Sequence, residues 1–230
     1  MDQENKHTIV HRNPADTVFD QSSDSVFRIS RMLRTLITSR FPGMIRDRKY
    51  HQQTHRSCMV GTEMVDWLIQ QCEHIQSRVQ AAWMWQVLLE SGQIVHVTRE
   101  QHFQDRYQCY RFSEDDAAIV SLPSMVERRE AADSAPSSLS LLLLLAPEAM
   151  LRVILRKQPR DRTPVELEII CEELRHLASF AYLSTSLRRR LAPIVRFEAH
   201  LGEGCPIYER GERSDAWYTL FSGKLHILGK

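Results

Sequence analysis

The chain has 230 residues, 43% of them hydrophobic and 26% charged, which is the composition of ordinary globular protein. Its formal net charge is only +1 at pH 7. The chain as a whole therefore has no electrostatic pull toward nucleic acid or lipid, so we expect no nucleic-acid partner and only a local electrostatic function. The polar first residues predict that there is no signal peptide.

The cysteines are scattered and odd in number, without the spacing of a disulfide framework. They are Cys58, Cys72, Cys109, Cys171 and Cys205. This usage predicts reduced thiols in a cytosolic protein. The sequence contains no CxxC or HExxH motif, so we expect no metal site. The most intense apolar run, residues 141–145, is by itself too short to span a bilayer.

The N-terminal part predicts a polar, disordered lead-in over residues 1–20 and then one amphipathic helix. Apolar residues repeat at helical spacing at Val26, Ile29, Leu33, Leu36 and Ile37. Asp24 or Ser25 is the expected cap, and Phe41-Pro42-Gly43 is the expected end.

A basic β-hairpin is predicted over residues 44–56. Its basic side chains are Arg46, Arg48, Lys49 and Arg56, with His51 and His55 between them. Two interpretations stay open: a solvated basic surface, or a functional patch.

Two helices and a second hairpin are predicted next. Apolar spacing predicts a helix through residues 60–71, with Thr62 as its cap. Ser77 and Gln80 have the spacing of a capping box for the next helix, which Gly92 would end. Alternating apolar residues predict strands at 94–97 and 107–112.

The composition changes after the second hairpin. Residues 116–138 are rich in Ala, Ser and acidic residues and contain Pro123 and Pro136, which predicts a linker. A helical segment is predicted over 139–183, where Thr163-Pro164-Val165-Glu166 is a strong helix start. Ser184 is expected to start a further helix, with Leu187, Leu191 and Ile194 facing inward and Arg188 to Arg190 facing solvent.

The last part reads as short strands separated by glycines. The strand-like runs are Val195–Phe197, Cys205–Tyr208, Trp217–Phe221 and Lys224–Ile227. This pattern predicts the first strands of a small β-barrel or jelly roll.

Three blocks of residues, in this order, resemble the N-terminal region of the cAMP-activated Rap exchange factors, the Epac family. Residues 41–51, 58–71 and 103–106 are similar to their DEP domain. Ile154–Pro159, Arg162-Thr163 and Glu172–Leu177 resemble the helical segment that follows it in the family. Gly204, Ile207, Gly211, Trp217-Tyr218 and Gly223 resemble the first strands of the cyclic-nucleotide-binding domain.

The resemblance implies an α+β chain with five parts: a lead-in over 1–20, a DEP winged-helix-like domain over 21–115, a linker over 116–138, a helical segment over 139–183, and a truncated cyclic-nucleotide-binding-like β-barrel over 184–230. In the family, the cassette that binds the phosphate of cAMP and the catalytic exchange region lie beyond the residues matched here. The resemblance therefore implies no cofactor in this chain, no specific cAMP binding, and contact with a Rap GTPase only through a region that is absent. No catalytic arrangement is legible, so we expect no enzyme activity.

Three functions remain in competition. The first is a cytoplasmic regulatory portion of a Rap exchange factor that targets membranes through Arg46, Arg48, Lys49 and Arg56. The second is a stand-alone DEP adaptor that binds a receptor tail or a signalling protein. The third, a complete cAMP receptor of the kinase-regulator type, is disfavoured because the phosphate-binding cassette is missing.

Overall fold

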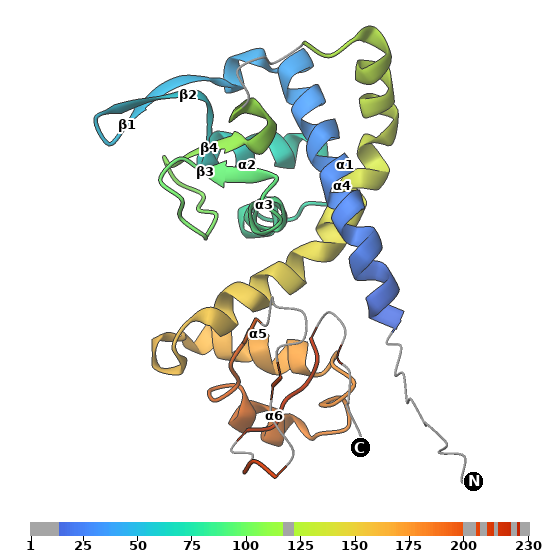
Figure 1. The fold of residues 1–230 in the computed structure, drawn as a ribbon, viewed down its shortest axis with the longest axis vertical. Helices are drawn as coiled ribbons and strands as arrows, with labels where there is room; N and C mark the ends of the chain where they lie inside the picture. The colour runs from blue at the N-terminus through green and yellow to red at the C-terminus, as the bar shows by residue number, and fades with distance from the viewer. Residues whose placement is uncertain are drawn as a thin grey trace, which may run out of the picture.

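The computed structural model describes residues 14–116, 122–199, 206–207, 211–213, 216–221 and 225, and it is an α+β fold (Figure 1). Its elements in chain order are α1 (Pro14–Arg40), η1 (Pro42–Met44), β1 (Arg46–Tyr50), β2 (Gln53–Val60), α2 (Gly61–Gln71), α3 (Arg78–Glu90), β3 (Ile94–His96), β4 (Cys109–Phe112), η2 (Ser113–Asp116), α4 (Met125–Arg156), η3 (Pro159–Asp161), α5 (Pro164–Leu174) and α6 (Thr185–Leu191).

Both predicted hairpins are present, and together they form one sheet. The four strands are antiparallel in the order β1-β2-β4-β3. In Figure 1 the β1–β2 hairpin forms an arm at one side of the domain, while the short strands β3 and β4 lie beside α2 and α3. The arm therefore presents more of its surface to solvent than the rest of the sheet does.

The start of α2 differs from the prediction, because Thr62 is not its cap. The cap position is Val60, whose side chain makes no capping hydrogen bond. Instead, Gly61 N donates to Gln108 O at 3.0 Å and Thr62 N donates to Arg106 O at 3.3 Å. The loop before β4 thus satisfies the free N–H groups of the helix start, which explains why a side-chain cap is not needed.

The start of α3 confirms the predicted cap at Ser77, whose side chain accepts from Gln80 N. The side chain of Gln80 reaches back one residue further than in a capping box and accepts from Gln76 N at 2.9 Å. Gly92 follows the helix with a φ of +70°, as expected of a glycine that ends a helix.

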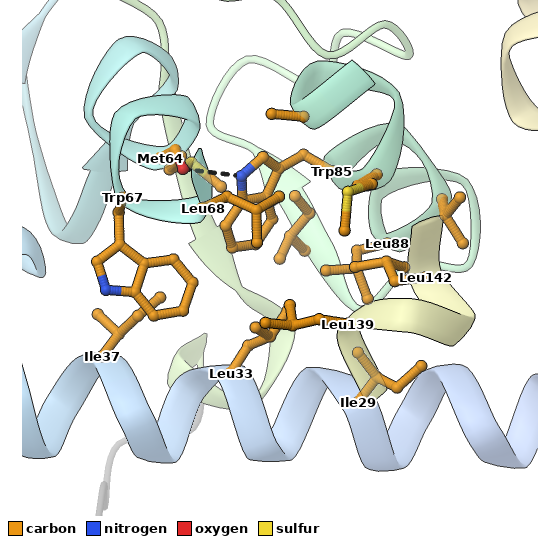
Figure 2. Close-up of a cluster of buried hydrophobic side chains, with 14 of the residues drawn as sticks. Ile29, Leu33, Ile37, Met64, Trp67, Leu68, Trp85, Leu88, Leu139 and Leu142 are labelled. Atoms are coloured by element: carbon orange, nitrogen blue, oxygen red, sulfur yellow. Dashed lines mark hydrogen bonds between the residues drawn. The ribbon is translucent and has the colours of Figure 1, made fainter. Parts of the chain in front are cut away.

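The larger of two hydrophobic cores, the first core, lies between α1, α2, α3 and α4 (Figure 2). α1 supplies Ile29, Leu33 and Ile37, at the helical spacing that the sequence predicted. Figure 2 shows these side chains facing those of α2 and α3. The side chains labelled there from α2, α3 and α4 are Met64, Trp67, Leu68, Trp85, Leu88, Leu139 and Leu142. Trp85 is fully buried, and its Nε1 donates to Met64 O at 3.0 Å.

Seven rings run in contact through this domain, from the tip of the arm to the end of α1. We call them the aromatic series: Tyr50, His96, Tyr110, Phe103, Trp85, Trp67 and Phe41. Successive ring centroids are between 4.6 Å and 6.4 Å apart, the separations of stacked and edge-to-face pairs. The sheet, the loop before β4 and both central helices are therefore joined by direct ring contacts.

The predicted linker is wrong over residues 125–138, which form the first half of α4. Ser124 caps this helix in a capping box with Glu127. Ala131, Leu139 and Leu142 are buried in the first core, so tertiary packing overrides the Ala, Ser and Pro composition that suggested a linker. Pro136 lies inside the helix. Figure 1 shows that α4 bends part-way along, as expected of a helix with internal prolines.

Among the described residues, α4 is the helix that is long and apolar enough to cross a membrane by length and composition. Its most apolar window has a mean hydropathy of 1.9 and includes far more than residues 141–145, which the sequence analysis judged too short. Within the fold, 44% of that window is buried. Apart from Val153, the buried side chains of α4 belong to the protein's own hydrophobic cores.

The second core lies between the end of α4, α5 and α6. Its buried members include Leu151, Ile154, Ile170, Leu174 and Phe180. The predicted start of α5 is confirmed: Thr163 and Glu166 make a capping box, with Pro164 at the first helical position.

The prediction for α6 is right about the cap and wrong about which side chains are buried. The Ser184 side chain accepts from Leu187 N. Arg188, expected in solvent, is 7% exposed, and its guanidinium donates to Leu183 O and to Thr185 Oγ1. Ile194, expected inside, is 65% exposed.

The two ends of the chain also depart from the predictions. Residues 14–20, part of the expected lead-in, are helical, and residues 1–13 lie outside the described part. At the other end, the described residues of Val195–Phe197 and Trp217–Phe221 form no strand, and no barrel is present in the described structure. The runs Cys205–Tyr208 and Lys224–Ile227 fall largely outside it. The α+β class holds, and the barrel is not shown.

Gly61 gives a direct test of this packing. A Cβ on Gly61 would lie 2.3 Å from Gln104 O and 2.9 Å from Arg106 O, both of them backbone atoms. We expect Gly61→Ala to lower the free energy of unfolding by about 3 kcal/mol, because the loop before β4 must move away from α2. Chemical denaturation followed by tryptophan fluorescence measures this loss. The matched control is Gly43→Ala, where a Cβ meets no atom within 4 Å. Equal stability of both variants would contradict the close approach.

Candidate surface-binding hairpin

The register of the arm decides which basic side chains reach solvent. Arg48 pairs with His55, and Lys49 pairs with Thr54. Directly paired residues share one face of an antiparallel ladder, and neighbours along a strand alternate between faces. Lys49 therefore lies on the face opposite Arg48. The ladder has a register shift between Arg46 and Arg48, opposite residues 56 and 57, and Arg56 is exposed there as Lys49 is.

Arg48 is buried, so it is not part of the exposed patch that the sequence predicted. The residue is only 7% exposed. Its Nε donates to Cys58 O and one Nη donates to Met44 O, both at 3.2 Å, and the same Nη pairs with the carboxylate of Glu63. Arg48 thus binds the arm to η1 and α2.

Arg46 lies at the start of β1. Of the four predicted basic residues, it is exposed but also close to a carboxylate. Its side chain is 61% exposed and lies 3.5 Å from the Glu63 carboxylate. Glu63 therefore receives two guanidinium groups, from Arg46 and Arg48. From the sequence alone, Glu63 is only a favourable charge at a helix start, because the strand register that creates this pairing cannot be read from spacing.

The arm as a whole remains electropositive. The four predicted basic residues are opposed by Asp47 and Glu63, which leaves a local charge of +2. Asp47 is occupied, because its carboxylate accepts from Ser57 N at 3.1 Å. The structure thus leaves Lys49 and Arg56 exposed on the arm, keeps Arg46 at its base in an ion pair with Glu63, and buries Arg48.

A shallow groove of about 390 Å³ lies at the base of the arm. Its apolar part is formed by Phe41, Met44 and Trp67, and its polar rim includes Arg46 and Glu63. The Phe41 ring meets the Trp67 ring edge-on at 6.1 Å and is 37% exposed. The sequence analysis used Phe41 only as a helix-ending signal, so it missed this exposed ring.

The thiols beside the arm are poor nucleophiles. Burial, the largest effect, raises the pKa of Cys58 to about 11, and burial also raises the pKa of Cys109. Cys58, Cys72, Cys109 and Cys171 are free and buried, as expected of reduced thiols. Within the described ranges, no group of three His, Cys, Asp or Glu side chains is arranged to hold a metal ion.

The role assigned to Arg48 can be tested by stability. Arg48→Ala leaves Glu63 with one weaker partner and leaves two carbonyl groups without their donor. We expect a loss of about 3 kcal/mol in the free energy of unfolding, the lower end for a broken buried pair, because the Glu63 side chain is 39% exposed. Arg56→Ala, on the exposed face, should change stability by less than about 0.5 kcal/mol in the same denaturant titration. An Arg48→Ala variant with the same free energy of unfolding as the wild type would contradict the structural role of Arg48.

The comparisons with known proteins agree with this architecture. Residues 44–112 match the family described as Domain found in Dishevelled, Egl-10, and Pleckstrin (DEP). Rap guanine nucleotide exchange factor 3 of Homo sapiens is 34% identical over 215 residues, which cover 93% of this chain and 23% of the relative. Rap guanine nucleotide exchange factor 1 of Caenorhabditis elegans is 30% identical over 192 residues, which cover 80% of this chain and 18% of the relative.

A shorter match falls on a different kind of protein. The vacuolar membrane-associated protein IML1 of Saccharomyces cerevisiae is 39% identical over 67 residues, 29% of this chain and 4% of that protein. By contrast, the exchange factors match from the DEP region through the helices that follow it, although the chain spans only about a quarter of their length or less. The chain therefore contains a DEP domain and belongs with the Rap guanine nucleotide exchange factors, being homologous over about nine tenths of its length to the N-terminal region of factor 3.

Proposed function

We propose that this chain is a non-catalytic regulatory region of a cytoplasmic Rap exchange factor and that its DEP domain brings the protein to anionic membrane surfaces. The observation that carries the proposal is the arm, on which Lys49 and Arg56 are both exposed to solvent. The homology supports the regulatory part, because it covers only the first part of the exchange factors.

The mechanism is local electrostatics at the arm. Each Lys or Arg close to an anionic leaflet contributes about 1 kcal/mol, and this attraction decays within a Debye length. Lys49, Arg56 and the outer part of Arg46 are the side chains that can reach a surface directly. Arg48 contributes indirectly, by holding the arm against Glu63 and the end of η1.

A second candidate is a DEP adaptor that binds a segment of another protein, and the groove beside Phe41 and Trp67 favours it. Apolar side chains dominate the contact that such a segment would make, so its binding would depend weakly on salt. Lipid binding through the arm would instead weaken steeply as salt increases.

The proposal is tested by sedimentation with phosphatidylcholine vesicles that contain phosphatidylglycerol. The double variant Lys49→Glu/Arg56→Glu should bind at least about thirtyfold more weakly, because two favourable contacts are lost and replaced by repulsion. The matched control is Arg129→Glu/Arg160→Glu, which makes the same charge change at side chains that are 87% and 86% exposed outside the arm.

Two results would contradict the proposal. One is binding that the arm variant and the control variant lower equally, since binding would then depend on net charge alone. The other is wild-type binding that is unchanged by salt, which would favour the groove.

We further expect no stimulation of nucleotide exchange on a Rap GTPase and no stoichiometric cAMP binding in calorimetry.

A further inference from the structure

Three histidines gather where the tip of the arm meets the sheet. The Tyr50 ring is their common neighbour, with ring centroids 4.2 Å from His51, 6.2 Å from His55 and 6.0 Å from His96. The His96 ring in turn lies 5.0 Å from Tyr110. We call these four residues, Tyr50, His51, His55 and His96, the histidine cluster. It joins the tip of the β1–β2 hairpin to β3 and β4 through ring contacts.

His96 lies in a buried site that disfavours a second proton. It is 2% exposed, and its Nδ1 lies 2.9 Å from Thr98 Oγ1, 3.3 Å from Thr98 N and 3.4 Å from Glu100 N. The two backbone N–H groups donate to Nδ1, which places the single proton of the neutral ring on Nε2, a buried atom without a hydrogen-bond partner. A second proton at Nδ1 would have Thr98 Oγ1 as its acceptor and would displace the two N–H donors. Protonation therefore gives up the contacts from Thr98 N and Glu100 N and leaves a charged ring whose Nε2–H is buried without a partner.

The groups that face His96 also disfavour its charge, with one exception. Burial, the largest effect, lowers the pKa of His96; Glu100 raises it, and His51 and His55 lower it. Tyr110 and Cys109 on β4 stay neutral, because burial raises the pKa of each. The Glu100 carboxylate is shared with the side-chain amides of Gln104 and Gln108. His55 resembles His96 in one respect: its Nε2 is buried without a partner.

The tip of the arm is a strained turn. The two turn residues, His51 and Gln52, have φ values of 48° and 62°. Two successive positive φ angles are the geometry of a type I′ hairpin turn, which favours Asn or Gly and costs energy with larger side chains.

We propose that the histidine cluster is an acid-released latch: protonation of His96 frees the tip of the arm from the sheet. Release lets the arm, which carries the exposed Lys49 and Arg56, approach a surface more closely. Acid would then strengthen contact with anionic lipid, and this second consequence rests on the proposed function, whereas the release of the tip does not.

The direction of the pH effect follows from proton linkage. The docked state holds His96 with a pKa below its ordinary 6.5, so the undocked state binds the proton more readily. The stabilisation of the docked tip is therefore complete above about pH 6.5 and is lost as the pH falls through that value toward the lower pKa of the docked state.

The test is amide exchange of the full chain, read by mass spectrometry at about pH 7.5 and about pH 5.5 and corrected for the intrinsic rate at each pH. We expect peptides over residues 46–57 to lose about tenfold in protection at the lower pH, with α2 and α3 unchanged. His96→Asn keeps an acceptor near the position of Nδ1 and cannot titrate, so it should abolish the change. His74→Asn, at an exposed histidine outside the cluster, should keep it.

If His96→Asn fails to fold, a second variant tests the latch. Tyr50→Leu removes the ring that touches all three histidines, and it should release the tip at both pH values. Protection of the arm that is independent of pH in the wild type, or equal pH responses of wild type and His96→Asn, would overturn the latch.

Sedimentation with vesicles at both pH values separates the two proposals. Phosphatidylglycerol keeps its charge over this pH range, so a change in sedimentation reports the protein. We expect binding about tenfold tighter at the lower pH in the wild type and in His74→Asn, and a smaller gain in His96→Asn. Exchange that responds to pH without any vesicle binding would overturn the membrane proposal and leave the latch standing. Vesicle binding without a pH response of exchange would do the reverse.

Discussion

The ion pair between Arg48 and Glu63 is the constraint on which the arm depends. A charged guanidinium in the interior is favourable only when its donors are occupied, and here two carbonyl oxygens and one carboxylate occupy them. These partners come from β2, from η1 and from α2, so one side chain fixes three elements. The base of the arm is thus fixed by charge, whereas its tip is held by rings.

Gly61 supplies the second constraint, a steric one. Its backbone touches the loop before β4, and the same loop carries Phe103, which stacks between Trp85 and Tyr110. The close approach at Gly61 therefore helps to position Phe103 between Trp85 and Tyr110. The loop has little regular structure of its own, yet it is held by backbone hydrogen bonds at one side and by ring packing at the other.

The sequence predicted the elements whose signals are local. The apolar stripe of Ile29, Leu33 and Ile37, the cap at Ser77 and the capping box at Thr163 each depend on residues within one helix. The sequence-based predictions failed where contacts with residues distant in the sequence determine the structure. Residues 125–138 have a linker composition, but they are helical because α1 and α3 offer them an apolar surface. Arg48 read as exposed because the register that turns it inward depends on pairing with β2.

α4 belongs to both cores, with Leu139 and Leu142 in the first and Leu151 and Ile154 in the second. Arg152 and Arg156 also hold it to Glu90 at the end of α3. The helix therefore joins the two cores covalently, so that a displacement of α5 and α6 would be passed to the packing of Leu139 and Leu142 in the first core.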